Sequence, residues 1–189
     1  MYRLKSIKLY FFSFLKIFFI NFKKFYFKSN YYNKKLVSFI PERTFYNPST
    51  YLSASLISTN SDFYKIANTT PKLLWQTEST NNLDFENLHS FLWLAKLDRK
   101  NSKDITKNII KSWIDIFYNY HPIVWEMEIT AKRIIGWASN TDLTLEDSDK
   151  IYKEKFFLSS IKQSNFLIKN FNSLHYEPSK IICCSAVIL

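Results

Sequence analysis

Apolar residues recur at the spacing of an amphipathic helix through most of the second half of the chain. This spacing predicts five helices, over about 84–98, 102–120, 128–139 and 145–171 and from 178 onward. Their starts carry cap signals: Asn101 or Ser102, a T-x-x-D capping box at Thr144 and Asp147, and Pro178 in a first turn. Because short loops join successive helices, we expect an all-α fold of stacked antiparallel helical hairpins.

The region before these helices has a different pattern. Residues 37–82 hold Pro41, Pro48 and Pro71 among polar clusters, which interrupt every apolar run before it reaches helical length. We expect an irregular linker there, in which the short piece around Trp75 forms a strand or lies extended across the helices. The predicted organisation is an N-terminal segment 1–36, a linker 37–82 and a helical domain 83–189.

Positive charge is concentrated at the N-terminus. The chain carries a net charge of +10, and residues 1–36 contribute nine basic side chains and no acidic one. The remainder is therefore close to neutral, and it shows no basic stripe or motif of a nucleic-acid-binding protein. Nucleic acid is thus the less favoured partner, and the basic character belongs to one segment.

The segment 1–36 combines these charges with an apolar run, and three interpretations stay open. The run is too short for a membrane span and contains Lys16. As a secretory signal it lacks a small-residue cleavage site. A helix on a membrane surface is possible, although Phe12 and Phe19 share the lysine side. The segment is thus a helix packed on its own body, a membrane-surface helix, or a signal or anchor.

The stretch from Trp113 to Trp137 is the chain's densest aromatic region, and Pro122 ends the helix that enters it. Large aromatic side chains at helical spacing either fill a core or line a groove that stacks against sugar rings. Arg133 requires a partner if it is buried, and Glu126 or Glu128 is the expected one; otherwise it awaits an anionic ligand. The candidate substrate-binding residues are Trp125, Arg133, Trp137 and His121.

The residues from His89 to Leu189 resemble the N-terminal helical domain of the heparinase II/III-like family. The resemblance rests on FLWLAKL, on KSWIDIF followed by P-x-x-W, and above all on T-A-K-R-I-I-G-W, which contains Arg133 and Trp137. Members of this family are polysaccharide lyases or similar proteins, with an incomplete α/α toroid followed by a β-sandwich. The resemblance implies part of such a toroid, and a bacterial periplasm or cell envelope as the location. Because family chains are several times longer, we expect this one to be truncated within the toroid.

The family resemblance also implies a reaction, which is β-elimination on uronate-containing polysaccharide. No position here matches the catalytic motifs, so we expect no catalytic residue, no activity of this chain alone, and an acidic polysaccharide as partner. Tyr118, Tyr120 and His121 cluster at the aromatic stretch, but a tyrosine base needs a strongly cationic setting. Histidine and cysteine spacing predicts no metal site, and no cofactor is expected.

Two functional hypotheses follow. The first is the helical part of a polysaccharide lyase, and the alternative is a small basic membrane-surface or interaction protein acting through residues 1–36. A truncated toroid also leaves apolar helix faces without neighbours, so we expect the isolated chain to self-associate.

Overall fold

The computed structural model describes residues 2–38, 74–75 and 82–189 and confirms an all-α fold. Within these residues there are α-helices and short 3-10 helices and no strand. The elements are α1 (Tyr2–Lys28), α2 (Asn30–Val37), α5 (Asn82–Ser90), η2 (Leu92–Lys96), α6 (Lys103–Phe117), α7 (Met127–Ala138), α8 (Thr141–Thr144), α9 (Lys150–Asn170), η3 (Phe171–Ser173) and α10 (Glu177–Ile188).

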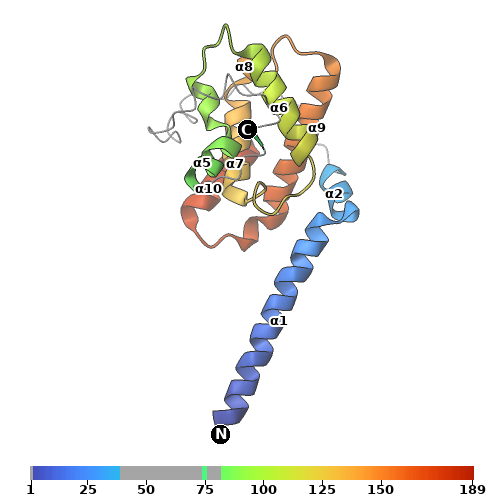
Figure 1. Ribbon diagram of the computed structural model, residues 1–189, viewed down its shortest axis with the longest axis vertical. Coiled ribbons are helices and arrows are strands. Elements are labelled where there is room, and N and C mark those ends of the chain that lie inside the picture. Colours follow the sequence, from blue (N-terminus) through green and yellow to red (C-terminus); the bar gives the residue numbers. More distant parts are fainter. Residues whose placement is uncertain (1, 39–73, 76–81) are drawn as a thin grey trace.

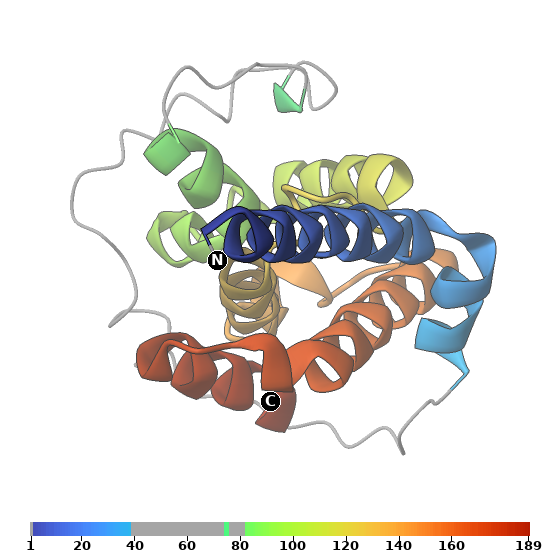
Figure 2. The same ribbon diagram turned by 90° about the horizontal axis from the view of Figure 1, so that it is seen from below.

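One long helix projects from a compact helical body (Figure 1). α1 has 27 residues, which corresponds to a length of about 40 Å. Ser29 separates it from α2, because its hydroxyl accepts a hydrogen bond from the Tyr32 N–H and so caps the second helix. Seen from below, α1 runs beneath the body toward the corner where α2 lies (Figure 2).

α2 packs against the helical body. Tyr32 and Leu36 are buried in the main core, and the Asn165 side chain donates a hydrogen bond of 2.6 Å to the Leu36 carbonyl. Asn170 donates to the Tyr32 hydroxyl at 3.0 Å. The predicted boundary at residue 36 therefore runs through this packed region, whereas most of the linker 37–82 lies outside the described residues.

α7 occupies the centre of the body and contacts α5, η2, α8, α9 and α10. Nine of its twelve residues are buried. The Trp137 ring lies 5.4 Å from the Trp113 ring, 5.5 Å from the Phe91 ring and 5.0 Å from the Phe156 ring, measured between centroids. These edge and tilted contacts are favourable aromatic geometries and make α7 the element around which the core is built.

The predicted helix over 84–98 is interrupted at Phe91. Phe91 adopts a left-handed backbone conformation with φ of 56°, and the chain continues as the 3-10 helix η2. The reason lies on α7: a Cβ at Gly136 would lie 2.8 Å from the Phe91 carbonyl oxygen. The chain's single glycine thus allows α7 to approach this turn closely, a contact that local periodicity cannot reveal.

The other predicted helices are found with shifted ends. α6 ends at Phe117, before the His121–Pro122 step, and α7 begins after the Glu126 cap. The capping box predicted at Thr144 is wrong, because the Thr144 hydroxyl donates to the Trp137 carbonyl. Asp149 caps α9 instead, accepting a hydrogen bond from the Tyr152 N–H at 2.8 Å. The toroid itself stays a prediction.

Candidate functional site

Three of the four predicted substrate-binding side chains are buried. Trp125, Arg133 and Trp137 are at most 1% exposed, and each lies among core side chains. His121 alone is half-buried, at the loop between α6 and α7. In this structure the two tryptophan faces are covered by protein, so neither ring offers a surface on which a sugar can stack.

Arg133 holds four separate parts of the chain together. Its Nε donates to the Gln163 side-chain oxygen at 2.6 Å, and one terminal nitrogen donates to the carbonyls of His89 at 3.0 Å and Val124 at 3.2 Å. The other terminal nitrogen donates to the Thr130 hydroxyl at 3.1 Å. These partners come from α9, α5, the loop before α7 and α7 itself. Arg133 is therefore a structural crosslink.

The predicted ion pair of Arg133 with Glu126 or Glu128 is wrong. Glu126 accepts hydrogen bonds from backbone N–H groups at the start of α7, and Glu128 pairs with Lys132 at 2.7 Å. The guanidinium instead lies 4.2 Å above the Trp113 ring. Burial lowers the pKa of Arg133, while neutral acceptors and the indole face stabilise its charge without a carboxylate.

His89 and His121 each accept a hydrogen bond that has a structural role. His89 is buried, and its Nδ1 accepts a hydrogen bond from the Trp113 indole N–H at 3.1 Å. Burial, together with the nearby Arg133 charge, lowers the pKa of His89 to about 3, so it is neutral at ordinary pH. His121 Nδ1 accepts from the Val124 N–H at 3.3 Å, and burial and Lys28 lower its pKa. Both rings are therefore acceptors that fix local backbone or indole geometry.

The tyrosines in the loop between α6 and α7 have an environment that disfavours proton abstraction. Burial raises the pKa of both Tyr118 and Tyr120, which makes their ionised forms less accessible. Lys162 lies 4.0 Å above the Tyr118 ring, but its Nζ donates hydrogen bonds to the Tyr118 carbonyl and to the Asn119 side-chain oxygen. Burial lowers the pKa of Lys162 to about 8. This lysine anchors the loop after α6.

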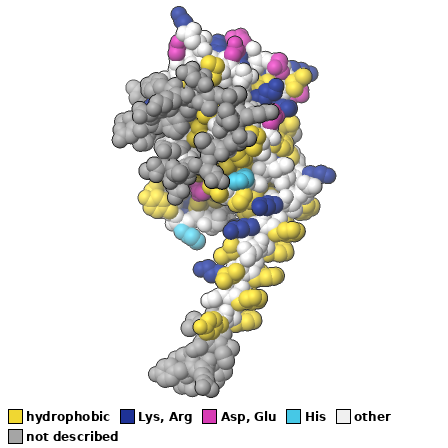
Figure 3. All heavy atoms as spheres, viewed as in Figure 1, with side chains coloured by type: hydrophobic (Ala, Val, Ile, Leu, Met, Phe, Trp, Pro, Cys, Tyr) yellow, Lys and Arg dark blue, Asp and Glu magenta, His cyan; other side chains and the backbone are white. Residues whose placement is uncertain are grey.

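Many of the exposed large apolar side chains among the described residues lie on α1. Five phenylalanines at helical spacing form one line, which we name the phenylalanine stripe: Phe11, Phe14, Phe18, Phe22 and Phe25. Their side chains are between 55% and 75% exposed. Lys16, Lys23 and Lys24 lie on the other side of the helix, and Figure 3 shows apolar atoms along one edge of α1 and basic groups along the other.

The sequence pattern left three interpretations of this N-terminal segment open, and the structure bears only on whether it packs against the body. From Phe27 onward the segment packs against the body, as the first interpretation expected, whereas the described side chains from Tyr10 to Phe25 are largely exposed. Within the described residues no helix combines the length and apolar character needed to cross a membrane.

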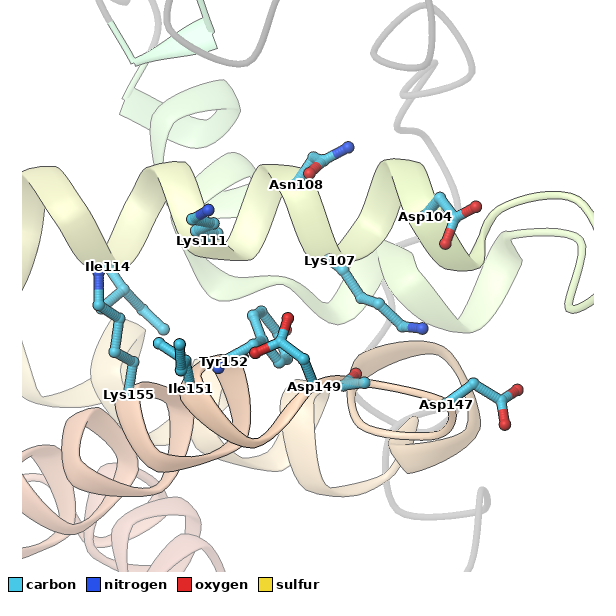
Figure 4. A pocket seen from close by; sticks show the side chains of 11 residues that line it. Asp104, Lys107, Asn108, Lys111, Ile114, Asp147, Asp149, Ile151, Tyr152 and Lys155 are labelled. Atoms are coloured by element: carbon cyan, nitrogen blue, oxygen red, sulfur yellow. Dashed lines mark hydrogen bonds between the residues drawn. The ribbon is translucent and has the colours of Figure 1, made fainter.

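A cleft between α6 and the start of α9 was not anticipated from the sequence. It has a volume of about 630 Å³ and a mixed polar lining that includes Lys107, Lys111, Asp149 and Tyr152 (Figure 4). No motif marked these residues, because they come from two elements some forty positions apart. A signal was present only in the two lysines four residues apart on α6. Among the described residues, no group of three or more histidine, cysteine, aspartate or glutamate side chains is arranged to hold a metal.

Comparison with known proteins gives no relative: no family model, no curated protein and no solved structure matches the chain. The resemblance to the heparinase II/III-like family therefore stays a prediction that rests on the quoted residues.

Proposed function

We propose that this protein attaches to anionic membrane surfaces through α1, which lies in the interface with its phenylalanine stripe in the acyl region and its lysines toward lipid headgroups. The observation that supports this proposal is the exposed stripe on a helix with seven basic side chains and no acidic one. Interfacial helices have this combination of an apolar face and a basic face.

Apolar burial and charge attraction together are large enough for reversible membrane attachment. Removing one phenylalanine side chain from water contributes roughly 1.5 kcal/mol or more, so five contribute roughly 7 kcal/mol. Each lysine or arginine near an anionic leaflet adds about 1 kcal/mol. Because micromolar affinity corresponds to about 8 kcal/mol, the stripe together with the charges suffices for reversible attachment.

The same charges argue against pairing between two copies of α1. A second copy brings seven positive charges to the same interface without a single carboxylate to compensate them. Like charges at close range are unfavourable, whereas an anionic lipid surface provides the opposite charge over the whole helix length. A bilayer is therefore the favoured partner of the stripe.

Vesicle co-sedimentation of the full chain tests this proposal. Deleting residues 1–36 would remove Phe27, Tyr32 and Leu36 from the core, so substitutions on α1 are the better tool. We expect wild-type protein to sediment with phosphatidylcholine vesicles containing phosphatidylserine, and the triple variant Phe14→Gln/Phe18→Gln/Phe22→Gln to remain in solution.

The matched control removes three exposed apolar side chains outside the stripe: Phe12, Phe19 and Ile20, each replaced by Gln. This control keeps most of the binding, because the apolar face is intact. Equal binding by both triple variants and the wild type would remove the stripe from the mechanism, and equal binding to vesicles without phosphatidylserine would remove the charges.

A second function concerns the body. We propose that it is the helical part of a heparinase II/III-like lyase, contributing saccharide-binding surface without a complete active site. Support comes from the T-A-K-R-I-I-G-W element, which lies within the central helix α7, and from the cleft beside α6. We expect no rise in unsaturated-uronate absorbance with heparin, heparan sulfate, alginate or chondroitin. Robust elimination by this chain would contradict the absence of catalytic groups.

A further inference from the structure

We propose that a patch on the body, formed by α2 and the end of α9, binds the phosphates of anionic lipid headgroups when α1 attaches to a bilayer. We name it the headgroup patch, and it consists of five exposed residues: Tyr31, Lys34, Lys35, Ile168 and Lys169. This inference rests on the proposed membrane attachment. It adds a second contact, on the body, and therefore a defined orientation of the body on the membrane.

The joint between α1 and α2 is tied to the body, so a bilayer that holds α1 also holds the body close. The buried Phe27 ring, at the end of α1, lies 4.7 Å from the Tyr32 ring of α2, measured between centroids. It also lies 5.1 Å from the Tyr120 ring and 6.1 Å from the Phe166 ring. The Tyr120 N–H donates a hydrogen bond of 3.3 Å to the side chain of Asn33. These contacts fix α2 and the end of α1 on the body.

The phenylalanine stripe and the body lie on opposite sides of α1. Phe18, in the middle of the stripe, and the buried Phe27 are nine residues apart, which at 3.6 residues per turn places them half a turn apart around the helix axis. The body therefore does not block a bilayer from the stripe. Figures 1 and 3 share one view, in which α2 lies on the same side as the apolar edge of α1. The outward face of α2 is thus placed to meet the bilayer next.

A series of contacts continues from the end of α1 across the headgroup patch. The Tyr31 ring lies 6.4 Å from the Tyr26 ring of α1, which follows the last phenylalanine of the stripe. The Lys35 ammonium lies 6.0 Å from the centre of the Tyr31 ring, and the Lys169 ammonium donates a hydrogen bond of 2.7 Å to the Lys35 carbonyl. Ile168 beside it is 54% exposed. Tyrosine, lysine and an exposed aliphatic side chain together suit the headgroup level of a membrane.

The lysines of the patch have no acidic partner among the described residues. Lys34, Lys35 and Lys169 form no ion pair within the described part of the chain. α1 and α2 contain no acidic residue, and α9 contains none after Glu154. Burial and the nearby Lys35 charge lower the pKa of Lys169, which agrees with repulsion between the two ammonium groups. A phosphate between them relieves this repulsion and accepts hydrogen bonds from both.

The position of the patch favours lipid over nucleic acid as the source of these phosphates. An anionic bilayer presents its headgroup phosphates directly beside the acyl region that receives the stripe, so one surface satisfies both features. Nucleic acid offers phosphates but no apolar phase for five exposed phenylalanines.

Vesicle co-sedimentation of the full chain tests the patch. The variant Lys34→Gln/Lys35→Gln/Lys169→Gln should bind vesicles of phosphatidylcholine and phosphatidylserine roughly tenfold more weakly or less well still, because each lysine near an anionic leaflet contributes to binding. The matched control Lys100→Gln/Lys111→Gln/Lys150→Gln removes the same charge from exposed lysines elsewhere on the body. It should change binding by about twofold or less, because charges more than about 10 Å from the lipid are screened.

A second measurement reports which end of the body rests on the membrane. A nitroxide is attached at Ile168→Cys or at Ile151→Cys, both exposed positions on α9 and about 25 Å apart along it, in protein carrying Cys184→Ser. On the same vesicles, the label at position 168 should become shielded from a water-soluble nickel relaxant. The label at position 151 should stay accessible.

The outcomes separate this inference from the proposed attachment. If the wild type binds, the two lysine variants bind equally and the label at position 168 stays accessible, the patch is not a membrane contact, although attachment through the stripe stands. Absence of wild-type binding contradicts both proposals. If the patch variant loses binding to an RNA duplex but binds vesicles as the wild type does, the patch takes nucleic acid and the lipid assignment is overturned.

Discussion

α1 and α7 are both apolar helices with basic side chains, yet they lie in opposite environments. Nine of the twelve residues of α7 are buried, including an arginine, whereas the described side chains of α1 from Tyr10 to Phe25 are largely exposed. The difference lies in what surrounds the charge. Arg133 meets neutral acceptors from four parts of the chain, while the lysines of α1 have no acidic side chain on their own helix.

This comparison shows that hydrophobic content alone does not decide burial. A cation is tolerated in a core when its hydrogen-bonding capacity is used up by partners, as it is for Arg133. Repeated lysines between phenylalanines present several charges that a core of this size cannot satisfy. Such a helix keeps its apolar face exposed, where it can contact lipid instead of the protein core. The proposed membrane attachment follows from that exposure.

The largest stability effect is expected when the buried cation is removed. Arg133→Met deprives the Gln163 side chain and the His89 and Val124 carbonyls of their donor, and unsatisfied buried groups are costly. We expect urea unfolding to show a loss on the order of 3 kcal/mol. The control Arg99→Met removes a half-buried arginine paired with Asp142 at the surface and should change stability by about half a kcal/mol or less. Equal midpoints for the two variants would contradict the crosslink.

Gly136→Ala should have the next largest effect. In an unobstructed helix this change is stabilising by about 1 kcal/mol, because alanine is the better helix former. Here the new Cβ would lie 2.8 Å from the Phe91 carbonyl oxygen, and main chain cannot move aside cheaply. We expect a net destabilisation of about 2 kcal/mol in thermal or urea unfolding. The sign of the change in unfolding free energy is the test, because a stabilised variant would mean that α7 does not approach the Phe91 turn this closely.

Acidification should destabilise the body through His89. Its folded pKa of about 3 lies below the ordinary value, so the unfolded chain takes up a proton first as pH falls below about 6.5. The stability contributed by the neutral ring is therefore present above that pH and is lost progressively toward pH 3. Between pH 7 and pH 5 we expect a decrease of about 2 kcal/mol. His89→Gln, which retains an acceptor for Trp113, should flatten this dependence; an unchanged slope would rule out His89 as its source.

The smallest stability effect is expected on α1. Phe18→Gln should change the unfolding free energy by about half a kcal/mol or less, because its side chain is exposed and packs on no core residue. Phe27→Ala, nine positions along the same helix, should cost about 3 kcal/mol, because Phe27 packs against Phe166 and Tyr32 in the core. Comparable losses for both variants would mean that the stripe is packed against protein.

Periodicity was sufficient to predict an all-α body and the approximate positions of α6, α7, α9 and α10, because the apolar faces of α6 and α7 follow the 3.6-residue repeat, whereas α2 and α8 were not predicted. It did not predict the break at Phe91, which depends on Gly136 in a helix 45 positions later. The partners of Arg133 were missed for a similar reason. Two of them are backbone carbonyls and the other two are the uncharged side chains of Gln163 and Thr130, so none has a charge that marks it as a partner.

The candidate sites differ in how far the sequence could identify them. The basic and apolar residues of α1 are local, so a membrane-surface helix was among the open interpretations, and only the exposure of the stripe was missing. The cleft is nonlocal, since its lysines are on α6 and Tyr152 is on α9. Its defining feature, a cavity between two helices, exists only in three dimensions.

The depth of α1 in a bilayer is the most direct test of membrane attachment. A nitroxide is attached at Phe18→Cys, on the stripe, or at Lys16→Cys, on the basic side, in protein carrying Cys184→Ser to remove the exposed native thiol. On vesicles containing phosphatidylserine, we expect the label at position 18 to become accessible to oxygen and shielded from a water-soluble nickel relaxant. The label at position 16 should stay accessible to the nickel relaxant. Equal nickel accessibility at both positions, unchanged by vesicles, would contradict the account.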